Sequence, residues 1–195
     1  MTTTDVTEIA CLGWGSLVWD PRKLLVSSPW ESDGPQVHIE FLRISDHRKG
    51  RVTLVLDASA AAVTSLWARM TATDLATARE SLRVREGVPT SNMARDIGVW
   101  CRGDTSPRLI PNLSEWSQSK RLNAVVYTNL GQNFRRDGQL PTAEEVAGYL
   151  RNLKGVIRYQ AEEYVRKAPR QINTAYRRAI EAALSWTPPS DRSSD

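Results

Sequence analysis

Runs of apolar residues about the length of a strand dominate the first two thirds of the chain. Such runs, rich in β-branched residues and bounded by polar turns, predict β-strands. The polar segment 46–50 joins two of them, 37–45 and 51–56, so we expect these two to form an antiparallel hairpin. The strand-like runs cover residues 8–13, 37–45, 51–56, 61–70, 97–101 and 122–128.

One internal segment has helical rather than strand-like signals. Thr73 and Asp74 are typical helix-start residues, and the helix that they open is expected to run to about Arg85. A shorter helix is expected where Asp20 can act as the N-cap and Pro21 can occupy the first helical position.

The last third of the chain, from residue 141 onward, has the periodicity of three helices. Pro169 predicts an end or a kink in the second helix. In the third helix an apolar face recurs at every fourth position, through Ile172, Tyr176, Ile180 and Leu184. Because such a face needs a surface to cover, we expect these helices to pack on the strands.

The order of elements favours an α+β fold. Strands and helices do not alternate regularly, which argues against a doubly wound parallel sheet and favours a small mixed, mainly antiparallel β-barrel with the C-terminal helices packed on it. We expect one domain over residues 1–186, with a barrel core at about 8–130 and a helical extension at about 141–186. Residues 187–195 hold two Pro and three Ser and are predicted to be disordered.

Composition and charge exclude several classes of protein. Of the 195 residues, 41% are hydrophobic and 25% charged, which is the composition of an ordinary packed core. The net charge is only +4 and no basic run stands out, so we expect no nucleic-acid partner. No signal-peptide pattern and no long apolar run occurs, so we expect a cytoplasmic protein without a membrane partner. Cys11 and Cys101 lack metal-ligand spacing and are expected to be buried thiols.

A glycine-containing loop follows the first predicted strand. In the sequence Gly13-Trp14-Gly15-Ser16-Leu17, two glycines allow a sharp turn and a close approach of the backbone to a ligand. Consecutive N–H groups at such a turn can bind a carboxylate or a developing oxyanion. A tight surface turn without any ligand is the alternative. The loop matches neither a dinucleotide-binding fingerprint nor a phosphate-binding P-loop.

Glu86 lies near the end of the internal helix on its apolar side. At 100° per residue, Leu82 falls about 20° to one side of Leu75 and Glu86 about 20° to the other. The carboxylate is therefore either bathed in solvent, because the helix ends at Gly87, or partly desolvated with a raised pKa. A raised pKa would suit a general base near neutral pH.

Four short motifs, in this order, resemble the gamma-glutamylcyclotransferase-like superfamily. They stand at 13–19 (GWGSLVW), 45–52 (SDHRKGRV), 82–86 (LRVRE) and 124–127 (AVVY). The first is similar to the glycine-serine loop of ChaC-type members, with Trp14 where the family has Tyr. The third is similar to the helix end that carries the family's catalytic glutamate, and the resemblance covers about residues 8–130.

The resemblance implies an enzyme that releases 5-oxoproline from a gamma-glutamyl amine or peptide. Glu86 would be the general acid and base, and the substrate would be bound by Gly13, Trp14, Gly15, Ser16, Leu17 and Tyr127. No metal or organic cofactor is implied, because the attacking amine belongs to the substrate. The expected partner is a small gamma-glutamyl molecule, and the chain is expected to be a monomer or a homodimer.

Two other functions fit the same residues. A protein with this fold and pocket could bind an acidic metabolite or peptide without turnover, or could hydrolyse a small amide. The fold alone does not distinguish these functions from cyclotransfer, because one fold can carry unrelated functions. The sequence names neither the leaving group of the substrate nor the biological pathway.

Overall fold

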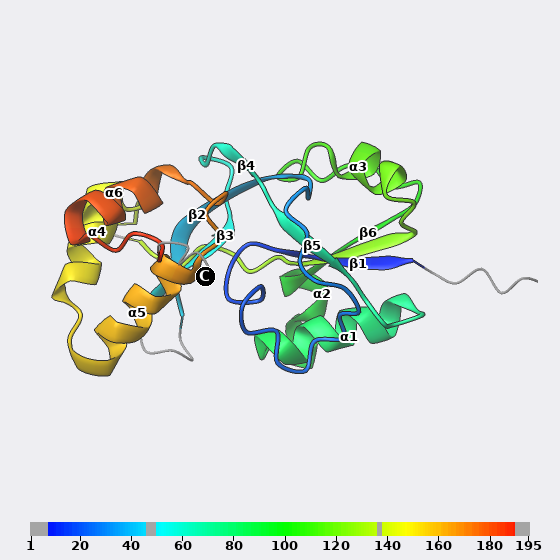
Figure 1. The fold of residues 1–195 in the computed structure, drawn as a ribbon, viewed down its shortest axis with the longest axis horizontal. Helices are drawn as coiled ribbons and strands as arrows, with labels where there is room; N and C mark the ends of the chain where they lie inside the picture. Colours follow the sequence, from blue (N-terminus) through cyan, green and yellow to red (C-terminus); the bar gives the residue numbers. More distant parts are fainter. Residues whose placement is uncertain (1–7, 46–49, 136–137, 190–195) are drawn as a thin grey trace, which may run out of the picture.

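The computed structural model describes residues 8–45, 50–135 and 138–189 (Figure 1). Its first sheet consists of β1 (Ile9–Gly13), β5 (Leu66–Arg69), β6 (Ile97–Cys101) and β7 (Ala124–Thr128). The strand order is β5-β1-β7-β6. β1 runs parallel to β7, and the other two neighbouring pairs are antiparallel. The sheet is therefore mixed, as expected for this α+β chain.

The second sheet contains the predicted hairpin. Its strands are β2 (Gln36–Ser45), β3 (Arg51–Leu56) and β4 (Ala62–Thr64), in the order β3-β2-β4 with antiparallel pairing. The register of β2 and β3 runs from Ile39 opposite Leu56 to Ser45 opposite Arg51. The predicted hairpin is confirmed, although residues 46–49 of its connection lie outside the described residues.

The two sheets do not close into a barrel, so that expectation is wrong. The chain passes from the second sheet to the first at Ser65, between β4 and β5. On the other side, within the described residues, the edge strand β3 pairs with no strand of the first sheet. Its Leu54 N–H donates to the hydroxyl of Tyr164 at 3.2 Å, a side chain of helix α5 (Gly155–Lys167). The helical region thus occupies the place where a further strand would have to pair.

Helix α1 (Leu75–Glu86) confirms the internal helix. Asp74 caps its start by accepting from Thr77 N at 2.8 Å, and Gly87 ends it in the left-handed conformation with φ 68°. A left-handed glycine is a common helix terminator, because it lacks the Cβ that opposes positive φ. Glu86 is therefore the last residue of α1.

The expected helix at Asp20 and Pro21 is wrong. Both residues lie between turns, and Arg22 adopts a positive φ of 52°. The buried Arg85 guanidinium donates to the carbonyl oxygen of Asp20 at 2.7 Å, which fixes this segment against α1 instead. A tertiary contact here prevails over a local helix signal.

The three C-terminal helices are confirmed, and three short elements appear that the sequence did not predict. The C-terminal helices are α4 (Ala143–Asn152), α5 and α6 (Ala175–Leu184), and the additional ones are η2 (Thr90–Asn92), α2 (Met93–Asp96) and α3 (Leu113–Ser119). α4 begins with a capping box between Thr142 and Glu145. The single-domain boundary at residue 186 stays a prediction, and residues 190–195 of the predicted tail lie outside the described residues.

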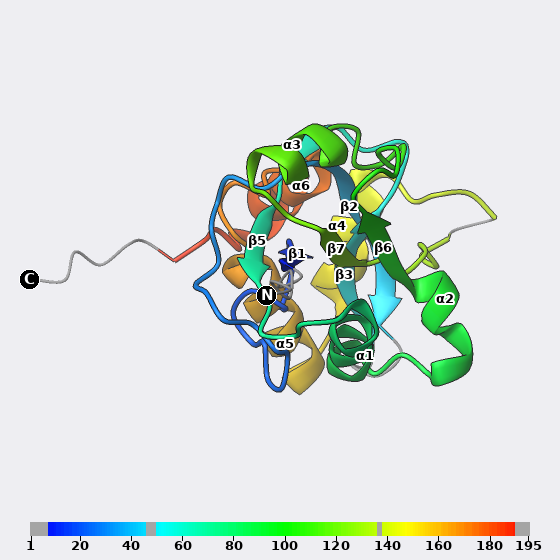
Figure 2. The same cartoon turned by 90° about the vertical axis from the view of Figure 1, so that its right-hand side faces the viewer.

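The helices cover the sheets from different sides. α4, α5 and α6 pack on β2 and β3, whereas α1 contacts β6 and β7. Figure 2 shows α1 and α3 on opposite faces of the first sheet. Of the predicted apolar face, Ile180 on α6 is fully buried, and Tyr176 and Leu184 pack against the same core. Ile172 is fully buried too, but it precedes α6, which begins later than predicted.

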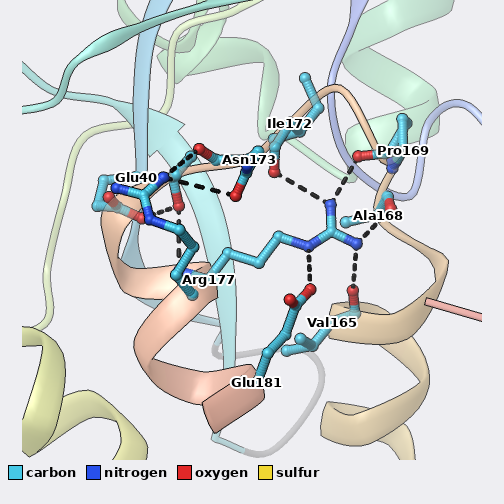
Figure 3. A network of polar contacts seen from close by, with 10 residues as sticks. Glu40, Val165, Ala168, Pro169, Ile172, Asn173, Arg177 and Glu181 are labelled. Atoms are coloured by element: carbon cyan, nitrogen blue, oxygen red, sulfur yellow. Dashed lines mark hydrogen bonds and ion pairs between the residues drawn. The ribbon is translucent and has the colours of Figure 1, made fainter. Parts of the chain in front are cut away.

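A buried arginine joins the end of α5 to α6 (Figure 3). The Arg177 guanidinium donates to the carbonyl oxygens of Pro169 (2.6 Å), Ala168 (2.9 Å) and Ile172 (3.0 Å). It also pairs with Glu181 at 2.8 Å, while its side chain is 1% exposed. These carbonyls belong to the segment that leads from the end of α5 to the start of α6. The cation therefore fixes the direction in which the chain leaves α5.

The buried Glu40 connects the same corner to the β2 strand. Its carboxylate accepts from the Thr174 hydroxyl at 2.5 Å and from Tyr176 N at 3.2 Å, at the start of α6. Burial raises the pKa of Glu40, although these hydrogen bonds oppose the shift. Arg177 and Glu40 together tie α5, α6 and β2 into one unit.

We expect Arg177→Met to lower the free energy of unfolding by about 3 kcal/mol or more, because several buried carbonyls would lose their donor. Urea denaturation measures this change. The neighbouring Arg178 is exposed, so Arg178→Met serves as the control and should cost less than about 1 kcal/mol. Equal effects of the two substitutions would contradict the role given to Arg177.

Candidate active site

The glycine loop follows β1 and folds into consecutive turns. Val18 N donates to the Gly15 carbonyl at 3.0 Å, and Asp20 N donates to the Ser16 carbonyl at 2.9 Å. Within the described residues, no acceptor takes the backbone N–H groups of Gly15, Ser16 or Leu17. The loop therefore has the free consecutive N–H groups that an anion-binding turn requires.

Close packing, rather than positive φ, requires the two glycines of this loop. A Cβ at Gly13 would lie 2.5 Å from the Trp30 ring. A Cβ at Gly15 would lie 2.4 Å from the hydroxyl oxygen of Tyr164. Contacts this short are not tolerated by real side chains, so Gly15 is the position at which α5 comes directly against the loop.

Trp14 and Leu17 belong mainly to the core. Their side chains are 5% and 4% exposed, and they pack in the two different hydrophobic clusters of the protein. Both residues also line the cavity described below. The loop is thus anchored on both sides by large apolar side chains, which holds the glycine and serine backbone between them in place.

The Arg85 side chain joins the loop to Glu86. Its guanidinium donates to Ser16 Oγ at 3.2 Å, to the Asp20 carbonyl at 2.7 Å and to Glu86 Oε1 at 2.9 Å. The Arg85 side chain is 2% exposed and that of Glu86 is 17% exposed. The Glu86 side chain is thus partly buried at the end of α1 rather than bathed in solvent. The same charges act on Cys11, a buried thiol of β1 whose pKa is raised by burial and by the negative charge of Glu86.

A cavity of about 550 Å³ brings the predicted loop and the predicted glutamate together. All five loop residues from Gly13 to Leu17 line it, and so does Glu86. The β2–β3 hairpin supplies another side through Arg43, Arg51 and Thr53. The volume lies in the range of pockets that enclose a small organic ligand.

Tyr164 is a cavity residue that sequence reasoning did not identify. It stands on α5, is 3% exposed, and packs edge-to-face on Trp19 with ring centroids 5.4 Å apart. The Arg51 guanidinium lies over its ring, 4.7 Å from the centroid. Burial raises the pKa of Tyr164, and charges on Glu86 and two arginines act on its hydroxyl as well. The phenol therefore keeps its proton, and with Leu54 N already donating to its oxygen, it can donate that proton into the cavity.

The structure does not bring Tyr127 to this cavity. Its ring covers Gly98 of the neighbouring strand β6, where a Cβ would lie 2.2 Å from the ring. Burial raises the pKa of Tyr127, and the next residue, Thr128, lines the cavity instead. Because Tyr127 does not line the cavity, its predicted substrate-binding role has no support in this geometry.

Over residues 8–45, 50–135 and 138–189, no three His, Cys, Asp or Glu side chains are grouped closely enough to hold a metal ion. Cys11 is buried as expected, whereas Cys101 is only half-buried.

Within the same part of the chain, no helix has both the length and the apolar character needed to cross a membrane.

Comparison with known proteins identifies the fold. No protein-family model and no curated protein matches the chain. A similar solved structure is that of a yeast gamma-glutamyl cyclotransferase specific to glutathione, at 15% sequence identity and a TM-score of 0.50. The match covers 93% of this chain and 97% of the yeast chain. The chain therefore has the fold of the gamma-glutamylcyclotransferase-like proteins, as its motifs suggest.

We expect Gly15→Ala to destabilise the protein by about 1–3 kcal/mol, because its Cβ would collide with the Tyr164 hydroxyl. Combining it with Tyr164→Phe removes the colliding oxygen, so the cost of Gly15→Ala should fall in that background. Thermal denaturation of wild type, the two single variants and the double variant measures the coupling free energy between positions 15 and 164. Gly131→Ala is the control, since no atom lies within 4 Å of the Cβ that it adds. Strictly additive effects at positions 15 and 164 would contradict the close contact.

Proposed function

We propose that this protein converts a gamma-glutamyl compound into 5-oxoproline and a free amine. The observation that carries the proposal is that Glu86 and the Gly13–Leu17 loop line one cavity. The fold shared with a gamma-glutamyl cyclotransferase supports the same conclusion.

Glu86 acts on the substrate as both base and acid. Among the described residues only its Oε1 atom has a hydrogen-bond partner, so Oε2 is available to take a proton. The α-amino nitrogen of the substrate loses a proton to Glu86 and attacks the γ-carbonyl carbon, which forms the C–N bond of a five-membered lactam. The bond from that carbon to the leaving nitrogen then breaks, and Glu86 returns the proton to the leaving nitrogen. All atoms of the substrate appear in the two products, and no water is consumed.

The loop and Tyr164 stabilise the negative charge that develops on the γ-carbonyl oxygen. Free N–H groups at Gly15, Ser16 and Leu17 are suitable donors, and fixed donors of this kind are a large source of catalysis in acyl transfer. The neutral hydroxyl of Tyr164 adjoins Gly15 and adds one further donor. Arg85 acts through these groups, because it fixes the position of Glu86 relative to the loop.

We expect Glu86→Gln to reduce 5-oxoproline release by at least about 100-fold, since the amide keeps the shape of the side chain but accepts no proton. Mass spectrometry of product formed from a panel of gamma-glutamyl compounds measures the rate. Glu80→Gln is the matched control, because Glu80 lies on the same helix, exposed and paired with an arginine. Equal release by wild type and Glu86→Gln would end this mechanism, and binding without turnover in both would indicate a binding protein.

We expect Tyr164→Phe to lower kcat/KM by about tenfold or more, because the variant loses one donor to the developing oxyanion while the ring stays packed. Steady-state kinetics on the best substrate of the panel provide the measurement. An unchanged kcat/KM in a folded Tyr164→Phe protein would assign this tyrosine to packing alone.

A further inference from the structure

An open groove of about 480 Å³ lies between helix α1 and the segment that carries Lys23 and Leu25. On the helix side, its lining begins at Ala76 and ends at Val84. These two positions lie about 12 Å apart along the helix axis, at about 1.5 Å per residue. The groove is therefore long enough for an extended chain, and the proposed reaction leaves it without a role.

The groove exposes apolar side chains to solvent. Leu25 is 40% exposed and Val84 is 51% exposed. They are two of the four large hydrophobic side chains that are exposed among the described residues, and both line this groove. Single exposed apolar residues are common on protein surfaces, but residues that gather in a concave site indicate a ligand with apolar surface.

Polar side chains of the same lining already have hydrogen-bond partners. The Ser81 hydroxyl accepts from Leu25 N at 2.9 Å. The two carboxylate oxygens of Glu80 accept from the Arg83 guanidinium at 2.6 and 2.7 Å. Lys23 is exposed, and a lysine can hold its ammonium group in water while its stem lies along an apolar surface. The lining thus favours an apolar ligand over a polar one.

Val84 joins this groove to the candidate active site, because it lines both the groove and the 550 Å³ cavity. Val84 and Glu86 stand in the last turn of α1, about 200° apart around the helix axis. Since both line the cavity, the cavity extends around the C-terminal end of α1, from Glu86 to the side on which the groove begins. A ligand held at Glu86 can therefore continue past Val84 into the groove.

The cyclisation involves only the glutamyl part of the substrate, so the group that leaves occupies surface beyond Glu86. We infer that the groove binds an apolar chain of this leaving group, over Val84 and toward Leu25. The inference rests on the proposed function. It names the substrate class as gamma-glutamyl compounds whose leaving nitrogen carries an extended apolar chain.

Two substrates that differ only in the length of an alkyl chain test the inference. Gamma-glutamyl-hexylamine has a longer chain on the leaving nitrogen than gamma-glutamyl-ethylamine and no added polar group. Wild type should release 5-oxoproline from the hexyl compound with a kcat/KM about tenfold or more above that for the ethyl compound. The reason is that each buried methylene contributes up to about fourfold.

Two substitutions in the groove should each lower this preference at least about threefold. Val84→Thr keeps the branched shape and replaces a methyl group by a hydroxyl, and Leu25→Gln replaces an apolar end by an amide. Both positions are exposed, so both variants should fold. Val156→Thr is the matched control, because Val156 is a 71% exposed valine on α5 that lines neither the groove nor the cavity. It should leave the preference unchanged, and thermal denaturation reports the folding of each variant.

Two outcomes would overturn the inference while leaving the proposed function intact. One is a wild-type protein that forms 5-oxoproline from compounds of the panel but shows no preference for the hexyl over the ethyl compound. The other is a preference that both Val84→Thr and Leu25→Gln retain, which would place the chain outside the groove.

If no gamma-glutamyl compound gives 5-oxoproline, the proposed function fails, and calorimetry on the same two compounds then decides. Tighter binding of gamma-glutamyl-hexylamine that Val84→Thr weakens supports the groove as a binding site for an apolar chain. Equal binding of the two compounds, or no binding of either, overturns it.

Discussion

The cavity depends on one steric constraint, which is that no atom can occupy the Cβ position of Gly15. The Tyr164 hydroxyl fills that space, and through this contact helix α5 touches the glycine loop at the end of β1. The same hydroxyl receives the Leu54 N–H of the edge strand β3, and the Tyr164 ring carries the Arg51 guanidinium. One buried phenol thus contacts the glycine loop, the edge strand β3 and Arg51. A bulkier residue at position 15 would separate all three.

A second buried group, Arg85, aligns the reacting side chain with that loop. Charges are rarely found at 2% exposure unless they are paired and hydrogen-bonded, and Arg85 satisfies this with a carboxylate, a hydroxyl and a backbone carbonyl. Because one planar group makes all of these contacts, Glu86 and Ser16 cannot move independently. The charged residues of the site, Arg85 and Glu86, therefore come from the end of α1, whereas Tyr164, which packs against the loop, comes from α5.

Local signals predicted the parts of the site that are close together in the sequence. The hairpin, the α1 helix with its Asp74 cap and Gly87 terminator, and the glycine loop after β1 all follow from residue patterns that act over a few positions. Tyr164 was not predicted, because its role depends on where α5 packs, and its sequence context is that of an ordinary helix. The closed barrel was wrong for a related reason, since strand periodicity does not tell whether an edge will meet a strand or a helix. Tyr127 was placed in the site by resemblance alone, and packing against Gly98 keeps it away from the cavity.

The corner held by Arg177 has a consequence for how the protein is made. Tyr164 reaches Gly15 only if α5 lies along β3. The direction of the chain after α5 is fixed by Arg177, which comes later in the sequence than the whole of α5. Protein synthesis delivers the chain from its N-terminus, and domains generally fold as units. The glycine loop therefore leaves the ribosome well before the side chain that completes its surroundings. A nascent chain that holds both the loop and Glu86 but not yet α5 has no assembled cavity, so the site needs every segment from β1 to α6.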